Sequence, residues 1–284
     1  MTAINGTNRT DVRTAAARYL QLGFVPIPVP RTRNSKAPEL SGWQHLQPTE
    51  DDLATLFPPD RSLNVGLLLG KPSGGLVDVD LDCKEAVRAA PIFLPETGWV
   101  SGRASNPRSH WWFILEDPPD QATQKYQGPG RGESCLVELR SSGAQTIAPP
   151  GIHESGEEIV WHEHTEPARV DLDVLDRAVR RIAAVALLAR SWPDQGSRQD
   201  ATLALCGGLL RAGWSQHEVE QFVGALAVVT QDDELSKRAR CVSQTAKKIK
   251  AGKQTTGWPR LGELLRSSAQ EIVTRLTTWL QLPP

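Results

Sequence analysis

A short segment in which acidic and apolar residues alternate constrains the fold of this chain more than any other feature. Residues 75–82 read GLVDVDLD. Alternate residues of a β-strand point to opposite faces of a sheet, so the valines and leucines face a core and the aspartates share the other face. The sequence therefore predicts a strand that presents three carboxylates, spaced roughly 6–7 Å apart, on Asp78, Asp80 and Asp82.

Like charges at this spacing repel one another, so the acidic strand needs a cation. Mg²⁺ suits such a site because it binds carboxylate oxygens and keeps coordination positions open for substrate phosphates. Two alternatives are a solvated strand face without a ligand and an EF-hand loop. The EF-hand is disfavoured, because Cys83 stands at the required glycine position and Ala89 at the final glutamate position.

A basic loop leads into the next apolar segment. This loop contains Arg103 and Arg108, and it is followed by His110 at the start of a predicted strand over residues 110–115. Histidine and arginine side chains can donate hydrogen bonds to the oxygens of a triphosphate. A histidine with a purely structural role is the alternative.

A further strand is predicted over residues 136–140, followed by a rigid turn with two prolines. The alternation places Glu138 and Arg140 on one face of this strand. Glu138 could bind a metal ion and Arg140 a phosphate, whereas the alternative is a surface ion pair on a half-exposed sheet. His153 lies just beyond the turn.

The pattern of elements predicts an α+β chain with two domains. Residues 1–10 are expected to be disordered, and the strands and short helices of residues 11–170 indicate a mixed α/β domain. Residues 171–195 indicate a connecting helix and linker. Residues 196–284 have helical periodicity, with helices expected at 201–212, 215–229, 233–251 and 261–280.

The charge distribution limits how the chain could hold an anionic partner. The formal net charge is −1, so any such partner must bind a local basic patch. The strongest candidate is the segment 236–253, which has no acidic residue; the alternative is a solvated helix face balanced by upstream acids. The predicted DNA-binding residues of this segment are Lys237, Arg238, Arg240, Lys247, Lys248 and Lys250.

Other features exclude several classes of protein. The four cysteines have no zinc or redox spacing. Residues 66–72 lack the spacing of a P-loop, and no GxGxxG segment is present. No apolar run approaches 18 residues and the N-terminus lacks a signal sequence, so the chain is expected to be soluble and cytoplasmic, with no membrane partner.

The order of these motifs resembles the primase–polymerase domain of the archaeo-eukaryotic primase superfamily, found in replication proteins of plasmids, phages and mobile elements. The resemblance covers about residues 12–165 and rests on a Lys-Ala-Pro segment at 36–38, the acidic strand, SGR at 101–103 before His110, and the Glu138 strand before the Pro-Pro turn. It implies a mixed-sheet catalytic domain followed by a smaller all-α domain.

The resemblance also implies roles for individual residues. The family's acidic pair falls on Asp80 and Asp82, its histidine on His110 and its third acid on Glu138, with Asp78 as an additional metal-binding carboxylate. Relatives usually have serine where this chain has Gly151. The implied nucleotide-binding residues are Arg103, Arg108, His110, Arg140 and His153.

The activity that the resemblance implies is template-dependent DNA synthesis. The expected enzyme is a nucleotidyltransferase, a DNA primase and DNA polymerase, with two Mg²⁺ or Mn²⁺ ions. Its partners would be single-stranded DNA, NTPs or dNTPs, and a replicative helicase. Two alternatives are a non-catalytic replication-initiation protein that binds DNA and a metal-dependent nuclease that uses the same carboxylates.

Overall fold

The computed structural model describes residues 11–283 apart from 33–35, 121–122, 130–133 and 267, so the segment 1–10, expected to be disordered, lies outside the described residues. The chain forms two compact units. A strand-rich unit comprises Met1–Asp80, Glu96–Gln124 and Glu138–Leu172, and a helical unit comprises Leu81–Pro95, Lys125–Val137 and Asp173–Pro284.

The smaller sheet of the strand-rich unit has three antiparallel strands, β1 (Val25–Pro30), β2 (Leu63–Leu68) and β8 (Gln145–Ala148), with β2 in the middle. Every second residue of β1 is a proline, which cannot donate a backbone hydrogen bond. Proline is tolerated at a sheet edge, which explains why β1 lies at the edge of this sheet.

The larger sheet contains the acidic strand and has the order β6-β7-β3-β5-β4-β10-β9, with β11 parallel to β5. Strands β3 and β5 are antiparallel, and their register places Asp80 opposite His110. The strands are β3 (Leu76–Leu81), β4 (Trp99–Arg103), β5 (Asn106–Leu115), β6 (Thr123–Gln127), β7 (Cys135–Arg140), β9 (Gly151–Ile152), β10 (Glu158–His164) and β11 (Ala168–Val170).

An apolar cluster joins the two sheets and helix α1 (Val12–Gln21) of the strand-rich unit. Trp99 and Trp112 of the larger sheet lie edge to face, with ring centroids 6.3 Å apart. They belong to the same cluster as Leu67 of β2 and Tyr19 of α1. Because this core joins β2 and β8 to β3 and β5, it also positions the polar side chains that lie beyond it.

Three short helical segments complete the strand-rich unit: the 3₁₀ turns η1 (Trp43–His45) and η2 (Lys71–Ser73), and helix α2 (Leu53–Leu56). Gly75 enters β3 with a φ of 91°, in the left-handed region that favours glycine. A Cβ at this position would lie 1.9 Å from the backbone oxygen of Leu115. Glycine is therefore required where the acidic strand begins.

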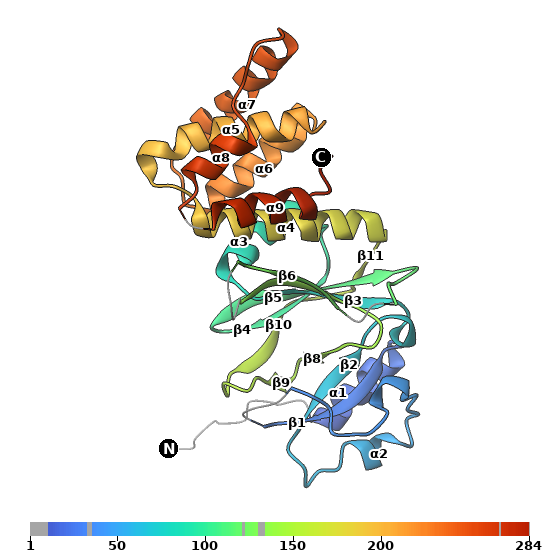
Figure 1. Cartoon of the computed structure of the whole chain (residues 1–284). Coiled ribbons are helices and arrows are strands. Elements are labelled where there is room, and N and C mark those ends of the chain that lie inside the picture. The colour runs from blue at the N-terminus through green and yellow to red at the C-terminus, as the bar shows by residue number, and fades with distance from the viewer. Residues whose placement is uncertain (1–10, 33–35, 121–122, 130–133, 267, 284) are drawn as a thin grey trace. The chain divides into compact units, whose positions relative to one another are not determined.

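The helical unit packs α3 against α6, and α5 against α6, α7 and α8 (Figure 1). Gly208 of α5 allows close packing, since a Cβ there would meet the indole ring of Trp258 at 2.6 Å. The helices are α3 (Lys84–Phe93), α4 (Leu172–Ser191), α5 (Arg198–Arg211), α6 (Gln216–Val229), α7 (Leu235–Lys250), α8 (Trp258–Leu264) and α9 (Ala269–Trp279), with the 3₁₀ turn η3 (Gln195–Ser197) before α5.

The predicted α+β class is confirmed, with a mixed sheet in the first part of the chain and helices in the second. The single helix expected over 261–280 is wrong: the chain leaves the helical conformation at Leu265, which has a ψ of 144°, and re-enters it after Ser268, which has a φ of 49°. Within the described residues, no helix combines the length and the apolar character that crossing a membrane requires.

Candidate active site

Burial changes steeply along the acidic strand. Asp78 is fully buried, Asp80 is 6% exposed, and Asp82, which follows the last residue of β3, is exposed. The alternation predicted from the sequence is present, but the three carboxylates have different surroundings. This difference follows from the apolar core, which covers the first half of the strand.

His110 of β5 lies against two of these carboxylates. Its Nδ1 atom is 3.0 Å from Oδ2 of Asp78 and 3.6 Å from Oδ1 of Asp80, and its side chain is 14% exposed. Burial alone would lower the pKa of His110, but the negative charges of Asp80 and Asp78 raise it above its usual value. His110 therefore carries positive charge more readily than an ordinary histidine.

Arg140 of β7 joins two acidic residues of the strand-rich unit. Its Nη2 atom lies 2.5 Å from Oδ2 of Asp80, and its Nε atom donates to Oε2 of Glu138 at 2.7 Å. Glu138 is 6% exposed, so this is not the surface ion pair that the sequence left open. Burial disfavours the charged guanidinium, but the carboxylates of Asp80, Asp78 and Glu138 raise the pKa of Arg140.

Asp80 is the centre of a charge cluster that also contains Asp78, His110, Glu138 and Arg140. Burial raises the pKa of the Asp80 carboxyl, but the positive charges of His110 and Arg140 outweigh burial and hold the pKa below its usual range. Lys36 and Arg103 act in the same direction. Asp80 is consequently held in its ionised form by the cationic side chains around it.

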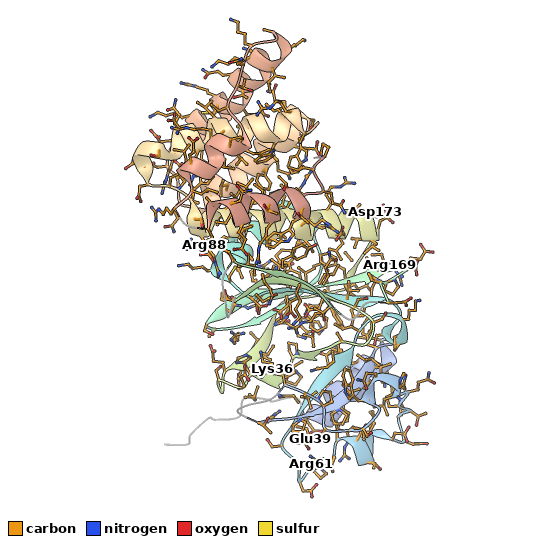
Figure 2. The ribbon with its side chains drawn as sticks, in the orientation of Figure 1. Lys36, Glu39, Arg61, Arg88, Arg169 and Asp173 are labelled. Atoms are coloured by element: carbon orange, nitrogen blue, oxygen red, sulfur yellow. The ribbon has the colours of Figure 1, made fainter. Side chains whose placement is uncertain are left out.

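Acidic partners hold the outer cations of the cluster. Nζ of Lys36, labelled in Figure 2, lies 3.6 Å from Glu154, and Nε of Arg103 lies 3.4 Å from Glu157. These are partly exposed contacts, which a stronger anion could replace. Nothing in the sequence decides whether Lys36 contacts substrate, because its proximity to Asp80 depends on the fold.

His153 lies in the same region, where burial together with Lys36 and Arg103 lowers its pKa. Arg108 has different partners. Its Nη2 atom donates to Glu163 at 2.6 Å, and its guanidinium lies over the ring of Trp111 at 5.3 Å from the ring centroid. The structure thus brings Arg103 toward Asp80 and His153 toward Lys36 and Arg103, whereas Arg108 contacts residues elsewhere on the sheet.

The surroundings of Asp78 differ from those expected of an additional metal ligand. Its Oδ2 atom accepts a hydrogen bond from Oγ1 of Thr146 at 2.7 Å and faces His110. Magnesium usually retains several water ligands, which a fully buried carboxylate cannot accommodate easily. The apolar core around the first half of β3 explains this difference.

Further donor atoms for a metal ion lie near the end of β3. Asp82 and Cys135 offer a carboxylate oxygen and a sulfur within 4.8 Å of each other, and Glu138 follows Cys135 on strand β7. Asp82 and Glu138 fit the oxygen preference of Mg²⁺ and Mn²⁺, whereas a thiolate favours softer metals. Cys135 had no recognisable signal in the sequence, because it forms no motif with another cysteine or histidine.

Helix α7 presents most of its basic residues to solvent. Lys237, Arg240 and the three lysines near its C-terminus are exposed, but Arg238 is 2% exposed. Nε of Arg238 donates to Asp232 at 2.8 Å, and its Nη2 atom donates to Glu234 at 3.0 Å. Arg238 therefore stabilises the helical unit instead of facing DNA, in contrast to the sequence prediction.

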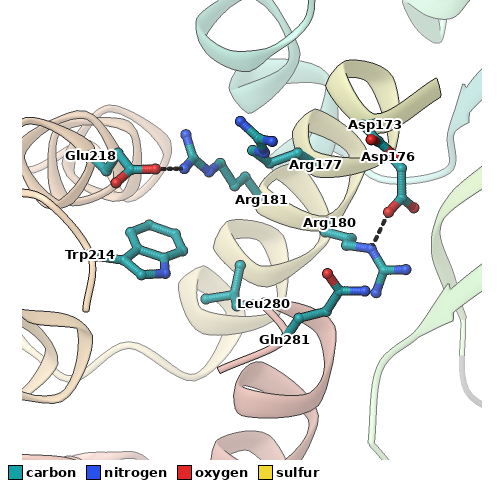
Figure 3. Close-up of a pocket in the computed structure, with 9 residues that line it drawn as sticks. All are labelled: Asp173, Asp176, Arg177, Arg180, Arg181, Trp214, Glu218, Leu280 and Gln281. Carbon is teal, nitrogen blue, oxygen red and sulfur yellow. Dashed lines mark hydrogen bonds and ion pairs between the residues drawn. The ribbon is translucent and has the colours of Figure 1, made fainter. Parts of the chain in front are cut away.

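The helical unit also contains a pocket of about 410 Å³, which the sequence did not predict (Figure 3). Two of its three arginines are paired: Arg180 donates to Asp176 at 2.5 Å and Arg181 to Glu218 at 2.6 Å. The guanidinium of Arg181 also lies over the ring of Trp214, 4.7 Å from the centroid. The lining is therefore nearly balanced in charge.

Comparison with known proteins identifies the region that contains the charge cluster. The family model described as bifunctional DNA primase/polymerase, N-terminal, matches residues 16–185, more than half of the chain. The match includes Asp80, His110, Glu138 and Arg140. No curated protein matches the chain. The family match and the motif order agree, and this chain belongs to the bifunctional DNA primase/polymerase family.

Proposed function

We propose that this protein is a template-dependent DNA primase and DNA polymerase. It would transfer nucleotides from NTPs or dNTPs onto a primer or an initiating nucleotide on single-stranded DNA, in the replication of a plasmid, phage or mobile element. The observation that carries the proposal is the geometry around the Asp80 carboxylate, which lies between His110 and Arg140, with Glu138 as the second partner of Arg140.

Asp80, Asp82 and Glu138 are the carboxylates that would hold the metal. Two Mg²⁺ or Mn²⁺ ions bound there would activate the attacking hydroxyl and neutralise the charge that develops on the leaving pyrophosphate. The cations around Asp80 keep its carboxylate ionised, so it stays competent to bind a cation at neutral pH.

The basic side chains would bind the triphosphate. His110 and Arg140 are held in place by contacts with the buried carboxylates of Asp78 and Asp80, which supports a role in orienting the substrate near the reacting centre. Lys36 and Arg103 are paired with Glu154 and Glu157 through partly exposed contacts. A triphosphate carries more charge than one carboxylate, and it would take over these cations on binding.

Single-stranded DNA would contact the helical unit through helix α7. The contact is sequence-independent, because lysine and arginine bind the phosphate backbone and not the base edges. Arg238 is left out of this surface because it is buried against Asp232. The proposed DNA-binding residues are Lys237, Arg240, Lys247, Lys248 and Lys250.

The test is incorporation of labelled nucleotides on primed and unprimed single-stranded DNA, with Mg²⁺, Mn²⁺ or EDTA. Products that require metal and primer would establish a polymerase, and products without a primer would establish a primase. DNA binding without synthesis would instead support a replication-initiation protein, and loss of template strands without triphosphates would support a nuclease.

A further inference from the structure

A buried carboxylate at the start of the acidic strand has no role in the proposed metal or phosphate contacts. Asp78 is fully buried, and its Oδ1 atom has no hydrogen-bond partner within the part of the chain that the structure describes. Moving a carboxylate from water into the protein interior costs several kcal/mol, and hydrogen bonds and opposite charges must offset this cost. The unpartnered oxygen of this buried carboxylate therefore calls for an explanation.

The contacts of Asp78 point to His110. Oδ2 accepts from Oγ1 of Thr146 at 2.7 Å and lies 3.0 Å from Nδ1 of His110. A carboxylate oxygen accepts hydrogen bonds, so the nitrogen that faces it is the one that carries a proton. Nε2 of His110 is left as the ring nitrogen available to a substrate.

We infer that Asp78 is a positioning residue that fixes the ring orientation of His110 and holds a proton on its Nδ1 atom, with Thr146 holding the carboxylate in place. This inference rests on the proposed function, since it assigns Nε2 of His110 to the substrate. Histidines that bind metals are commonly oriented by a carboxylate on the other ring nitrogen, and loss of that partner typically costs about 10–100-fold in activity or affinity.

The packing of three strands makes this arrangement rigid. Asp78 is on β3, His110 on the neighbouring strand β5, and Thr146 on β8 of the smaller sheet. Thr146 Oγ1 also lies 3.4 Å from Nη1 of Arg140, whose guanidinium contacts Asp80. The hydroxyl of Thr146 thus connects the orientation of His110 with that of Arg140.

The competing role for Asp78 is direct metal binding through its unpartnered Oδ1 atom. The two roles make opposite predictions for Asp78→Asn. A positioning role leaves the number of bound Mn²⁺ ions unchanged and their dissociation constants within about twofold, but disturbs His110. A ligand role removes an ion or weakens its binding by at least about tenfold.

The first experiment is ¹⁵N NMR of histidine-labelled protein without substrate, with the His110 signals assigned by their loss in His110→Gln. We expect a hydrogen-bonded proton on Nδ1 in the wild type, and its loss or clear upfield shift in Asp78→Asn. Mn²⁺ titration of the same samples supplies the second readout. An unchanged Nδ1 proton signal, or loss of Mn²⁺ binding in Asp78→Asn, would overturn the inference.

Two further variants keep the result interpretable. Thr146→Val removes the other hydrogen bond to Oδ2 and is expected to shift the Nδ1 proton in the same direction, so it serves if Asp78→Asn does not fold. Ser109→Ala is the matched control, because Ser109 is fully buried beside His110 and its hydroxyl has no partner among the described residues. It is expected to leave the His110 signals unchanged.

The kinetic readout separates this inference from the proposed function. In an active protein, Asp78→Asn should lower kcat/KM for the incoming nucleotide by about 10–100-fold, while Ser109→Ala stays near the wild-type value. If the wild type incorporates no nucleotide, the proposed function fails, but the NMR and Mn²⁺ results still decide whether Asp78 orients His110.

Discussion

The guanidinium of Arg140 lies 2.5 Å from the carboxylate of Asp80. A cationic side chain thus touches the carboxylate that we assign to metal binding. The contact keeps Asp80 ionised, and it also competes electrostatically with any cation that approaches the same oxygen atoms. Arg140 is therefore expected to set both the metal affinity and the triphosphate affinity of the site.

Arg140→Gln tests this dual role. Removing the positive charge should tighten Mn²⁺ binding by on the order of tenfold, because one repulsive charge near the ion is lost. The same change should raise KM for the incoming nucleotide, because a phosphate-binding donor is lost. Mn²⁺ titration and steady-state kinetics measure the two effects.

The control for this change is Arg61→Gln, which removes an exposed arginine paired with Glu39. It should leave both quantities at their wild-type values. Equal Mn²⁺ affinity in wild type and Arg140→Gln would show that Arg140 does not act on the metal-binding carboxylates.

The backbone at Gly75 supports the acidic strand. Gly75→Ala should lower the free energy of unfolding by more than about 3 kcal/mol, because the new Cβ would collide with the backbone oxygen of Leu115. Gly74→Ala is a close control: Gly74 also has a positive φ, but nothing lies within 4 Å of a Cβ there. It should cost only about 1–2 kcal/mol. Similar urea midpoints for the two variants would contradict this account.

The buried pair between Asp232 and Arg238 should make the helical unit sensitive to acid. Burial raises the pKa of Asp232, but the hydrogen bonds from Arg238 outweigh it, so the pKa is lower than in the unfolded chain. The stability that ionised Asp232 contributes is present above the unfolded value of about 3.9 and is lost as the pH falls through the lower folded value.

Asp232→Ala should accordingly reduce the free energy of unfolding at pH 7 by about 3 kcal/mol, since it leaves Arg238 buried without its main partner. The difference from wild type should shrink below about pH 4. Urea unfolding at several pH values measures it. The neighbouring exposed residue supplies the control, Asp233→Ala, and a loss of equal size in both variants would rule out a specific role for the buried pair.

The exposed lysines of α7 should govern the salt dependence of DNA binding. Replacing Lys247, Lys248 and Lys250 by alanine should weaken binding of single-stranded DNA and reduce the slope of log affinity against log salt by about 2, given about 0.7 per phosphate contact. Fluorescence anisotropy with a labelled oligonucleotide measures the slope.

A triple variant of equal charge loss provides the comparison for α7. This variant replaces three cations outside α7 that are paired with nearby carboxylates, namely Arg61, Lys71 and Arg260. Replacing them by alanine should leave the slope nearly unchanged. If both triple variants lose the same affinity, the effect comes from net charge and not from the α7 surface.

Strand alternation was sufficient to predict part of the site. The pattern of β3 placed Asp80 on the face opposite Val79 and Leu81, and the pattern of β7 placed Glu138 and Arg140 on one face. The structure brings the three side chains together with His110. The strand face of each side chain follows from local periodicity, whereas the position of β3 between β5 and β7, neither of which is next to it in the chain, is not visible in the order of residues.

Other features depend on contacts between distant segments. The surroundings of Asp78 differ from those of Asp80 because Thr146 of the smaller sheet, which is distant in sequence, donates a hydrogen bond to the Asp78 carboxylate. In the sequence, Arg238 cannot be distinguished from the other basic residues of α7, but its ion pairs with Asp232 and Glu234 hold it in a buried position within the helical unit. Alternation and charge counting describe one element at a time, so neither could distinguish these cases.

The most direct test of the central claim is the rate at which the protein adds one nucleotide to a labelled primer on single-stranded DNA with Mn²⁺ or Mg²⁺. The wild type and Asp120→Ala, which removes an exposed carboxylate paired with Lys71, should extend the primer at similar rates. Asp82→Ala should be slower by at least about 100-fold. Failure of the wild type to extend the primer, or equal rates for Asp82→Ala and wild type, would contradict the assignment of a nucleotidyltransferase site to the acidic strand.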